Sequence, residues 1–108
     1  TLNAVVNQRS QDVLTANNWN VVQYAVLVHM LAQVCDMRVG ELVHVIADAH
    51  IYDRHIPIVR ELITRPMHEA PTFRLNPEIH DFYEFTRNDV QVDNYVTGEQ
   101  IENIPVAI

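Results

Sequence analysis

The sequence predicts one α+β domain over residues 1–108, with a mixed β-sheet packed on a long buried helix and on a second, amphipathic helix. Two segments, 2–8 and 41–52, have the alternation or the β-branched composition that is typical of strands. Between them, 21–35 carries apolar residues at helical spacing. Strands and helices in this order, with further strand-like segments later, favour one domain with a single core.

Polar side chains follow the first expected strand. Residues 2–8 alternate, and Arg9, Ser10 and Asp12 come where that strand should end. A guanidinium matches phosphate or carboxylate oxygens, and a neighbouring hydroxyl adds a donor to the same anion. The group therefore predicts an anion site, with an ordinary solvated strand end as the alternative. A loop over 13–18 leads to the helix.

The expected helix at 21–35 is apolar on nearly every side, which predicts burial in the middle of the fold. Arg38 and Gly40 supply the cation and the glycine that favour a helix end. Cys35 lies late in this helix among apolar neighbours. We expect it to be a buried structural thiol and not a nucleophile.

The segment 41–52 lacks proline and glycine after Gly40 and predicts a central strand. Asp48, His50 and Tyr52 are spaced two apart near its end. On a strand these three side chains project from one face, where they can line a pocket together.

The second half predicts smaller elements. A helix over 54–64 accommodates Pro57 in its first turn, and short strands are expected at 72–75 and 90–95. The apolar end, 101–108, is expected to dock against the protein or a bound ligand. The residues of the second helix expected to face inward are Ile56, Val59, Leu62 and Ile63.

Composition excludes several classes of function. The chain has 14 acidic and 7 basic residues and a net charge of -7, which disfavours nucleic-acid binding. No apolar run reaches the roughly 20 residues of a membrane span, and no signal peptide is visible. A single cysteine fits a reducing compartment, so we expect a cytoplasmic protein. The start at Thr1, directly in strand-like sequence, suggests a piece of a longer chain.

Catalytic and metal sites find little support in the residues. His44 and His50 would lie about 20 Å apart on one strand, so we expect no metal site. Ser10 is the single serine, and nothing places it within reach of a histidine and an aspartate. Two glycines exclude a glycine-rich phosphate loop. The two polar strand ends together fit a nucleoside monophosphate, by residue type alone.

Several separated motifs, in matching order over essentially the whole chain, resemble the C-terminal part of thymidylate synthase. These motifs are Gln8-Arg9-Ser10-Gln11-Asp12, Asn20 opening a helix, Met30 to Cys35, Asp48-Ala49-His50-Ile51-Tyr52 with His55-Ile56, Leu75-Asn76-Pro77-Glu78, and the closing Pro105-Val106-Ala107-Ile108.

The resemblance implies a site for deoxyuridine monophosphate (dUMP). Arg9 and Ser10 would bind the phosphate, Asn20 the uracil edge, and His50 and Tyr52 the sugar 3′-hydroxyl. An asparagine amide both donates to O4 and accepts from N3–H, as a uracil reader must.

For the co-substrate, 5,10-methylenetetrahydrofolate, the resemblance implies that Asp12 faces the pterin. Val106, Ala107 and Ile108 would close over the folate. It also implies a homodimer, no metal, and reductive methylation of dUMP to dTMP.

The departures from the family pattern concern catalysis. The nucleophilic cysteine in its Pro-Cys-His setting is absent, so no catalytic residue is present and the chain alone should be inactive. The loop 13–19 lacks the usual glycine-rich sequence, and Ala47 stands where glycine is usual. Two alternatives remain open: a non-catalytic nucleotide-binding or assembly relative, and a pyrimidine-nucleotide hydroxymethylase.

Overall fold

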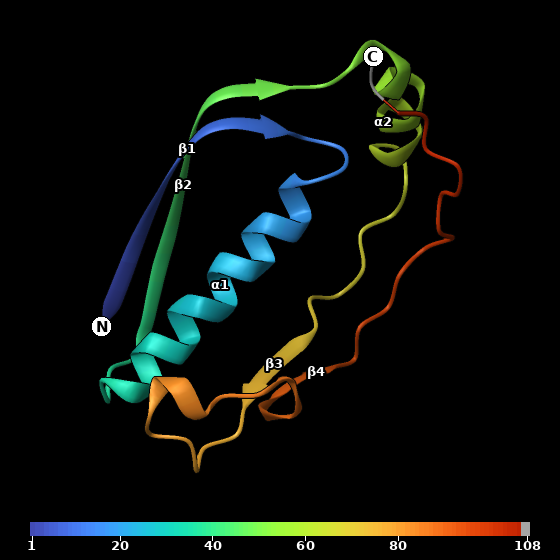
Figure 1. Ribbon diagram of the computed structural model, residues 1–108. Helices are drawn as coiled ribbons and strands as arrows, with labels where there is room; N and C mark the ends of the chain where they lie inside the picture. Colours follow the sequence, from blue (N-terminus) through green and yellow to red (C-terminus); the bar gives the residue numbers. More distant parts are fainter. Residues whose placement is uncertain (107–108) are drawn as a thin grey trace.

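The computed structural model describes residues 1–106 and confirms an α+β chain (Figure 1). The elements follow one another as β1 (Leu2–Asp12), α1 (Asn17–Val34), β2 (Val39–His50), the 3₁₀ turn η1 (Asp53–His55), α2 (Ile56–Leu62), β3 (Thr72–Leu75), the 3₁₀ turns η2 (Phe82–Glu84) and η3 (Arg87–Asp89), and β4 (Val90–Asp93). None of the helices within 1–106 is long and apolar enough to cross a membrane.

The first three elements form a β-α-β unit. β1 and β2 pair in parallel, and α1 is the crossover that packs on one face of the pair (Figure 1). Parallel strands need such a crossover because the end of the first strand and the start of the second lie at opposite edges of the sheet. Consequently the carboxyl ends of both strands meet at one edge, next to the start of α1.

The strands form two separate sheets, where the sequence had suggested one mixed sheet. β1 and β2 make a parallel pair, and β3 and β4 make an antiparallel pair. β4 ends at Asp93, earlier than expected, because Asn94 adopts a left-handed conformation with φ of 59°. The short strand at 72–75 is confirmed.

The boundaries of β1 and β2 differ from the sequence expectation at the polar residues. β1 continues to Asp12, so the polar group at 8–12 lies inside the strand. Burial alternates along it until Gln11, which is 2% exposed. β2 ends at His50 and leaves Tyr52 in the following loop.

Gly40 does not end the first helix, as had been expected, but lies inside β2. The left-handed turn falls at Asp36, with φ of 53°. Gly40 is needed for space: a Cβ there would lie 2.8 Å from the carbonyl oxygen of Leu2 and would also collide with the Asn3 side chain. Asn3 occupies this position because its Oδ1 accepts a hydrogen bond of 2.8 Å from the backbone N–H of Glu41.

α1 is less buried than its composition predicted. It begins at Asn17, and of its residues only Val28 and Ala32 are buried, while Trp19 is 78% exposed. Cys35, which caps the helix, is exposed, so the expectation of a buried thiol is wrong. The reason is that within residues 1–106 the neighbouring elements cover one side of a helix that is apolar on nearly every side.

α2 is shorter than expected and mostly exposed. Pro57 lies in its first turn, as predicted. The inward face is not as predicted: Val59 is partly buried, whereas Ile56 and Leu62 are each 37% exposed and Ile63 is 76% exposed. η1 precedes the helix and takes up residues that had been assigned to it.

Candidate functional site

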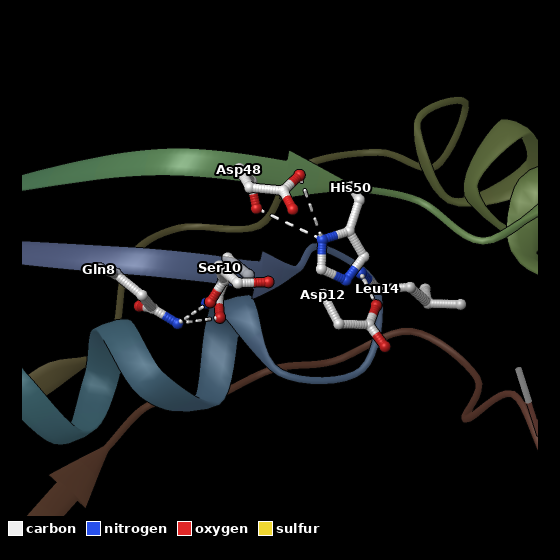
Figure 2. Close-up of polar contacts among 7 residues, drawn as sticks. Gln8, Ser10, Asp12, Leu14, Asp48 and His50 are labelled. Carbon is white, nitrogen blue, oxygen red and sulfur yellow. Dashed lines mark hydrogen bonds and ion pairs between the residues drawn. The ribbon is translucent and has the colours of Figure 1, made fainter.

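The carboxyl ends of β1 and β2 bring together the two polar groups singled out in the sequence. In the strand register Ser10 lies opposite Asp48, and Asp12 lies opposite His50. Figure 2 shows these four side chains gathered at the ends of the two strands. The convergence follows from parallel pairing, which places both strand ends at the same edge.

Asp12 holds the turn that leads into α1. Its Oδ1 accepts hydrogen bonds from the backbone N–H groups of Leu14, at 3.2 Å, and of Thr15, at 3.4 Å, and its Oδ2 accepts one from the Thr15 hydroxyl. Burial opposes the charged carboxylate, but these hydrogen bonds and the nearby charge of His55 outweigh it and lower the pKa of Asp12. Asp12 is therefore a preorganised anion whose oxygens are partly occupied.

His50 and Tyr52 lie beside each other although the strand ends between them. Their rings meet edge to face with centroids 5.0 Å apart. The His50 Nδ1 lies 3.3 Å from the backbone oxygen of Asp48 and 3.7 Å from its carboxylate. A carbonyl at Nδ1 favours the N–H there, and no hydrogen bond to Nε2 is found within residues 1–106.

Arg9 and Ser10 do not yet form a common anion clamp. Successive side chains on a strand project to opposite faces, and here Arg9 is exposed while Ser10 is partly buried. Within residues 1–106 no hydrogen bond or ion pair involves the Arg9 guanidinium. The guanidinium must move, or the anion must sit at the strand edge, for both to contact it.

Asn20 lies in the first turn of α1, three residues after the helix begins at Asn17. Its backbone N–H donates to the carbonyl oxygen of Ala16 at 2.9 Å, and its side chain is partly buried. The helix start that the sequence had assigned to Asn20 thus belongs to Asn17. Asn20 follows three residues later, still near the end of α1 that begins beside the polar edge.

A glutamine network beneath the site was not recognised from the sequence. The Gln8 amide oxygen accepts a hydrogen bond from His44 Nε2 at 2.8 Å, and its nitrogen donates to the Ser10 carbonyl at 2.9 Å and to Gln11. Gln11 in turn donates to Asn17 Oδ1 at 3.2 Å. The network ties β2, β1 and α1 together under Ser10. The alternation along β1 places Gln8 on the half-buried face, and a polar side chain there needs hydrogen-bond partners, which is the sequence feature that could have predicted the network.

The C-terminal segment reaches this edge. His55, 2% exposed in η1, has its Nε2 2.8 Å from the carbonyl oxygen of Pro105. Arg54 donates to the carbonyl oxygen of Val106 at 3.4 Å. The tail therefore contacts η1 through its backbone, but the apolar packing expected from its composition is not seen, since Ile104 is 38% and Val106 80% exposed. Ala107 and Ile108 lie outside the described residues. The sequence patterns included His55 only within the His55-Ile56 motif and predicted no contact for it.

Among the described residues, neither a metal centre nor a cysteine nucleophile lies at this edge. Within 1–106 no group of three or more histidine, cysteine, aspartate or glutamate side chains is placed to hold a metal ion. Cys35 follows the far end of the 18-residue helix α1, roughly 27 Å from its start. The edge therefore offers hydrogen bonding and charge for binding a polar ligand.

Fold and site together define an α+β protein with a β-α-β unit whose polar groups gather at the carboxyl ends of its parallel strands. The family model for thymidylate synthase matches residues 1–108. The chain belongs to the thymidylate synthase family.

Two relatives and one solved structure illustrate the similarity. The chain is 41% identical over 100 residues to the thymidylate synthase of Bacillus atrophaeus, covering 93% of this chain and 44% of that protein. It is 34% identical over 101 residues to that of Oenococcus oeni, covering 94% of this chain and 31% of that protein. The structure of thermostable thymidylate synthase A from Bacillus subtilis matches with a TM-score of 0.89 and 40% identity, over 93% of this chain and 36% of that one. The chain spans less than half the length of these relatives.

Proposed function

We propose that this chain is the C-terminal portion of a thymidylate synthase, which reductively methylates dUMP to dTMP with 5,10-methylenetetrahydrofolate in the cytoplasm. The observation that carries the proposal is the register of the parallel pair, with Ser10 opposite Asp48 and Asp12 opposite His50. Phosphate donors and sugar-binding groups from two strands thereby come to one edge, as a nucleoside monophosphate requires.

The proposed dUMP site divides among three elements. Arg9 and Ser10 of β1 bind the phosphate through charge-assisted hydrogen bonds. Asn20 of α1 reads the uracil edge by donating to O4 and accepting from N3–H. His50 and Tyr52 hold the 3′-hydroxyl, and their edge-to-face contact at 5.0 Å supports a shared target.

The proposed folate site uses Asp12 and the tail. The lowered pKa of Asp12 keeps its carboxylate charged and able to accept a hydrogen bond from the pterin. Val106, Ala107 and Ile108 close over the folate and exclude water. The tail's approach to η1, through Pro105 and Val106, supports this arrangement.

Titration calorimetry of dUMP into the longer protein that we propose contains this chain tests the function. We expect binding, and at least a tenfold weaker affinity in Arg9→Ala, because a charge-assisted hydrogen bond contributes about 1.5–3 kcal/mol. Arg87→Ala removes an exposed arginine outside the site and is the matched control. Absence of binding to the unaltered protein would favour a non-catalytic relative, the alternative suggested by the changed loop at 13–19.

A further inference from the structure

His55 is the one buried titratable side chain among residues 1–106. Its Nε2 lies 2.8 Å from the Pro105 carbonyl oxygen, so Nε2 carries the hydrogen and donates. Its Nδ1 is buried without a hydrogen-bond partner. A buried polar atom without a hydrogen-bond partner is unfavourable, so burial of this ring costs free energy that other contacts must offset. The hydrogen bond to the Pro105 carbonyl is the polar contact that the ring makes within residues 1–106.

Three neighbours fix the location of the His55 ring. The backbone N–H of His55 donates to the Tyr52 carbonyl at 2.8 Å, and the two rings meet edge to face at 5.8 Å. Asp12 is close enough for the charge of His55 to contribute to its lowered pKa. The ring therefore stands between the end of β1, the Tyr52 side chain and the tail.

The tail depends on few contacts. Residues 94–106 contain no helix or strand, and in Figure 1 this segment returns alongside the rest of the chain to α2. Three side chains form its hydrogen bonds within the described residues. Arg65 donates to Glu99 O at 2.6 Å, His55 to Pro105 O at 2.8 Å, and Arg54 to Val106 O at 3.4 Å. The arginine contacts are exposed and that of His55 is partly buried, so the His55 bond is the one of the three that is shielded from water.

We propose that His55 is a positioning residue that anchors the C-terminal tail beside Asp12 and Tyr52. The anchor acts through the backbone carbonyl of Pro105, so it fixes the path of the tail whatever side chains follow. The inference rests on the proposed function only in naming what the tail covers, because the anchor itself is a contact between two parts of this chain.

Tail mobility and carboxypeptidase digestion of the full chain test this anchor without any ligand. In His55→Phe we expect the heteronuclear ¹⁵N NOE of Ile104 and Val106 to fall, and release of Val106 by carboxypeptidase to accelerate about fivefold or more, the factor expected for one lost hydrogen bond. His55→Gln offers an amide N–H at a similar reach and should restore both values toward those of the unaltered chain. His80→Phe, at an exposed histidine, should change neither.

A second measurement needs no substitution at His55. In the unaltered chain the Nε2-bound proton should give a slowly exchanging NMR signal with a nuclear Overhauser effect to Pro105, and removal of residues 105–108 should abolish that signal. A signal that is absent, or that survives the truncation, would overturn the proposal even if His55→Phe fails to fold. So would unchanged tail mobility in a folded His55→Phe. Failure of the proposed function would instead appear as a lack of dUMP binding with the anchor intact.

Discussion

Gln8 and His44 face each other across the parallel pair of β1 and β2, with the Gln8 amide oxygen 2.8 Å from His44 Nε2. The same amide group contacts the Ser10 carbonyl and Gln11. One side chain thus joins both strands to the buried Gln11, which contacts the start of α1. Because the atoms involved are partly or fully buried, loss of this side chain leaves several polar groups unsatisfied.

Replacement of Gln8 by alanine should therefore destabilise the chain by about 1–3 kcal/mol, the cost of leaving buried polar partners without hydrogen bonds. Urea denaturation followed by circular dichroism measures this loss. Asn7→Ala on the exposed face of the same strand is the control and should change the free energy of unfolding by less than about 0.5 kcal/mol. Equal effects of the two substitutions would contradict a structural role for the network.

Gly40→Ala should destabilise the chain by about 1–3 kcal/mol, because the added Cβ would lie 2.8 Å from the Leu2 carbonyl oxygen and force the start of β1 away from β2. Gly98→Ala is a matched control, since the nearest atom to its Cβ is a side-chain nitrogen of Arg65 at 3.5 Å. Thermal unfolding of both variants compares them directly. A neutral Gly40→Ala would show that the Asn3 side chain and the start of β1 shift without cost.

The lowered pKa of Asp12 predicts a pH dependence of stability. A carboxyl group with a lower pKa in the folded state stabilises it above the ordinary carboxyl pKa, and this contribution is lost as the pH falls through the folded value. Below about pH 4, unfolding free energy should therefore fall less steeply in Asp12→Asn than in the unaltered chain. Glu102→Gln, an exposed change of the same charge, is the control. A ¹³C titration of the Asp12 carboxyl checks the direction, and a pKa above the ordinary value would refute it.

The 108-residue chain alone should release no tritium from 5-tritiated dUMP in the presence of the folate co-substrate. Without a thiolate to add to C6 of the pyrimidine, no covalent enolate forms to attack the one-carbon unit. A complete thymidylate synthase assayed in parallel is the positive control. Release above background would contradict this expectation, and repeating the assay with Cys35→Ser would show whether the exposed thiol is responsible.

The β-α-β unit was predictable because its signals are local. Alternation in β1, the helical spacing of α1 and the β-branched run of β2 identify each element without knowledge of the others. Parallel pairing then brings Ser10, Asp12, Asp48 and His50 to one edge. The sequence patterns could not predict which face of α1 is buried. The helix is apolar on nearly every side, but its neighbours within 1–106 cover only part of it.

The remaining differences arise from contacts distant in sequence. In the sequence Gly40 has the features of a helix end. In the structure it is needed because the side chain of Asn3, 37 positions earlier, occupies the space beside it. Arg9 and Ser10 are adjacent in sequence, but continuation of β1 to Asp12 places their side chains on opposite faces, so an anion shared by both would lie at the strand edge. His55 gains its importance from Pro105, 50 positions later, which no local pattern reveals.

The unpaired edges of the parallel pair affect how the isolated chain behaves in solution. Within residues 1–106 β1 and β2 have only each other as neighbours, so each of these strands of 11 and 12 residues presents one long edge of free backbone donors and acceptors. Val5, Val43 and Val45 are 62%, 46% and 47% exposed on the uncovered face. Long apolar edges of this kind template the addition of further strands. We therefore expect copies of the isolated chain to associate through these edges as their concentration rises.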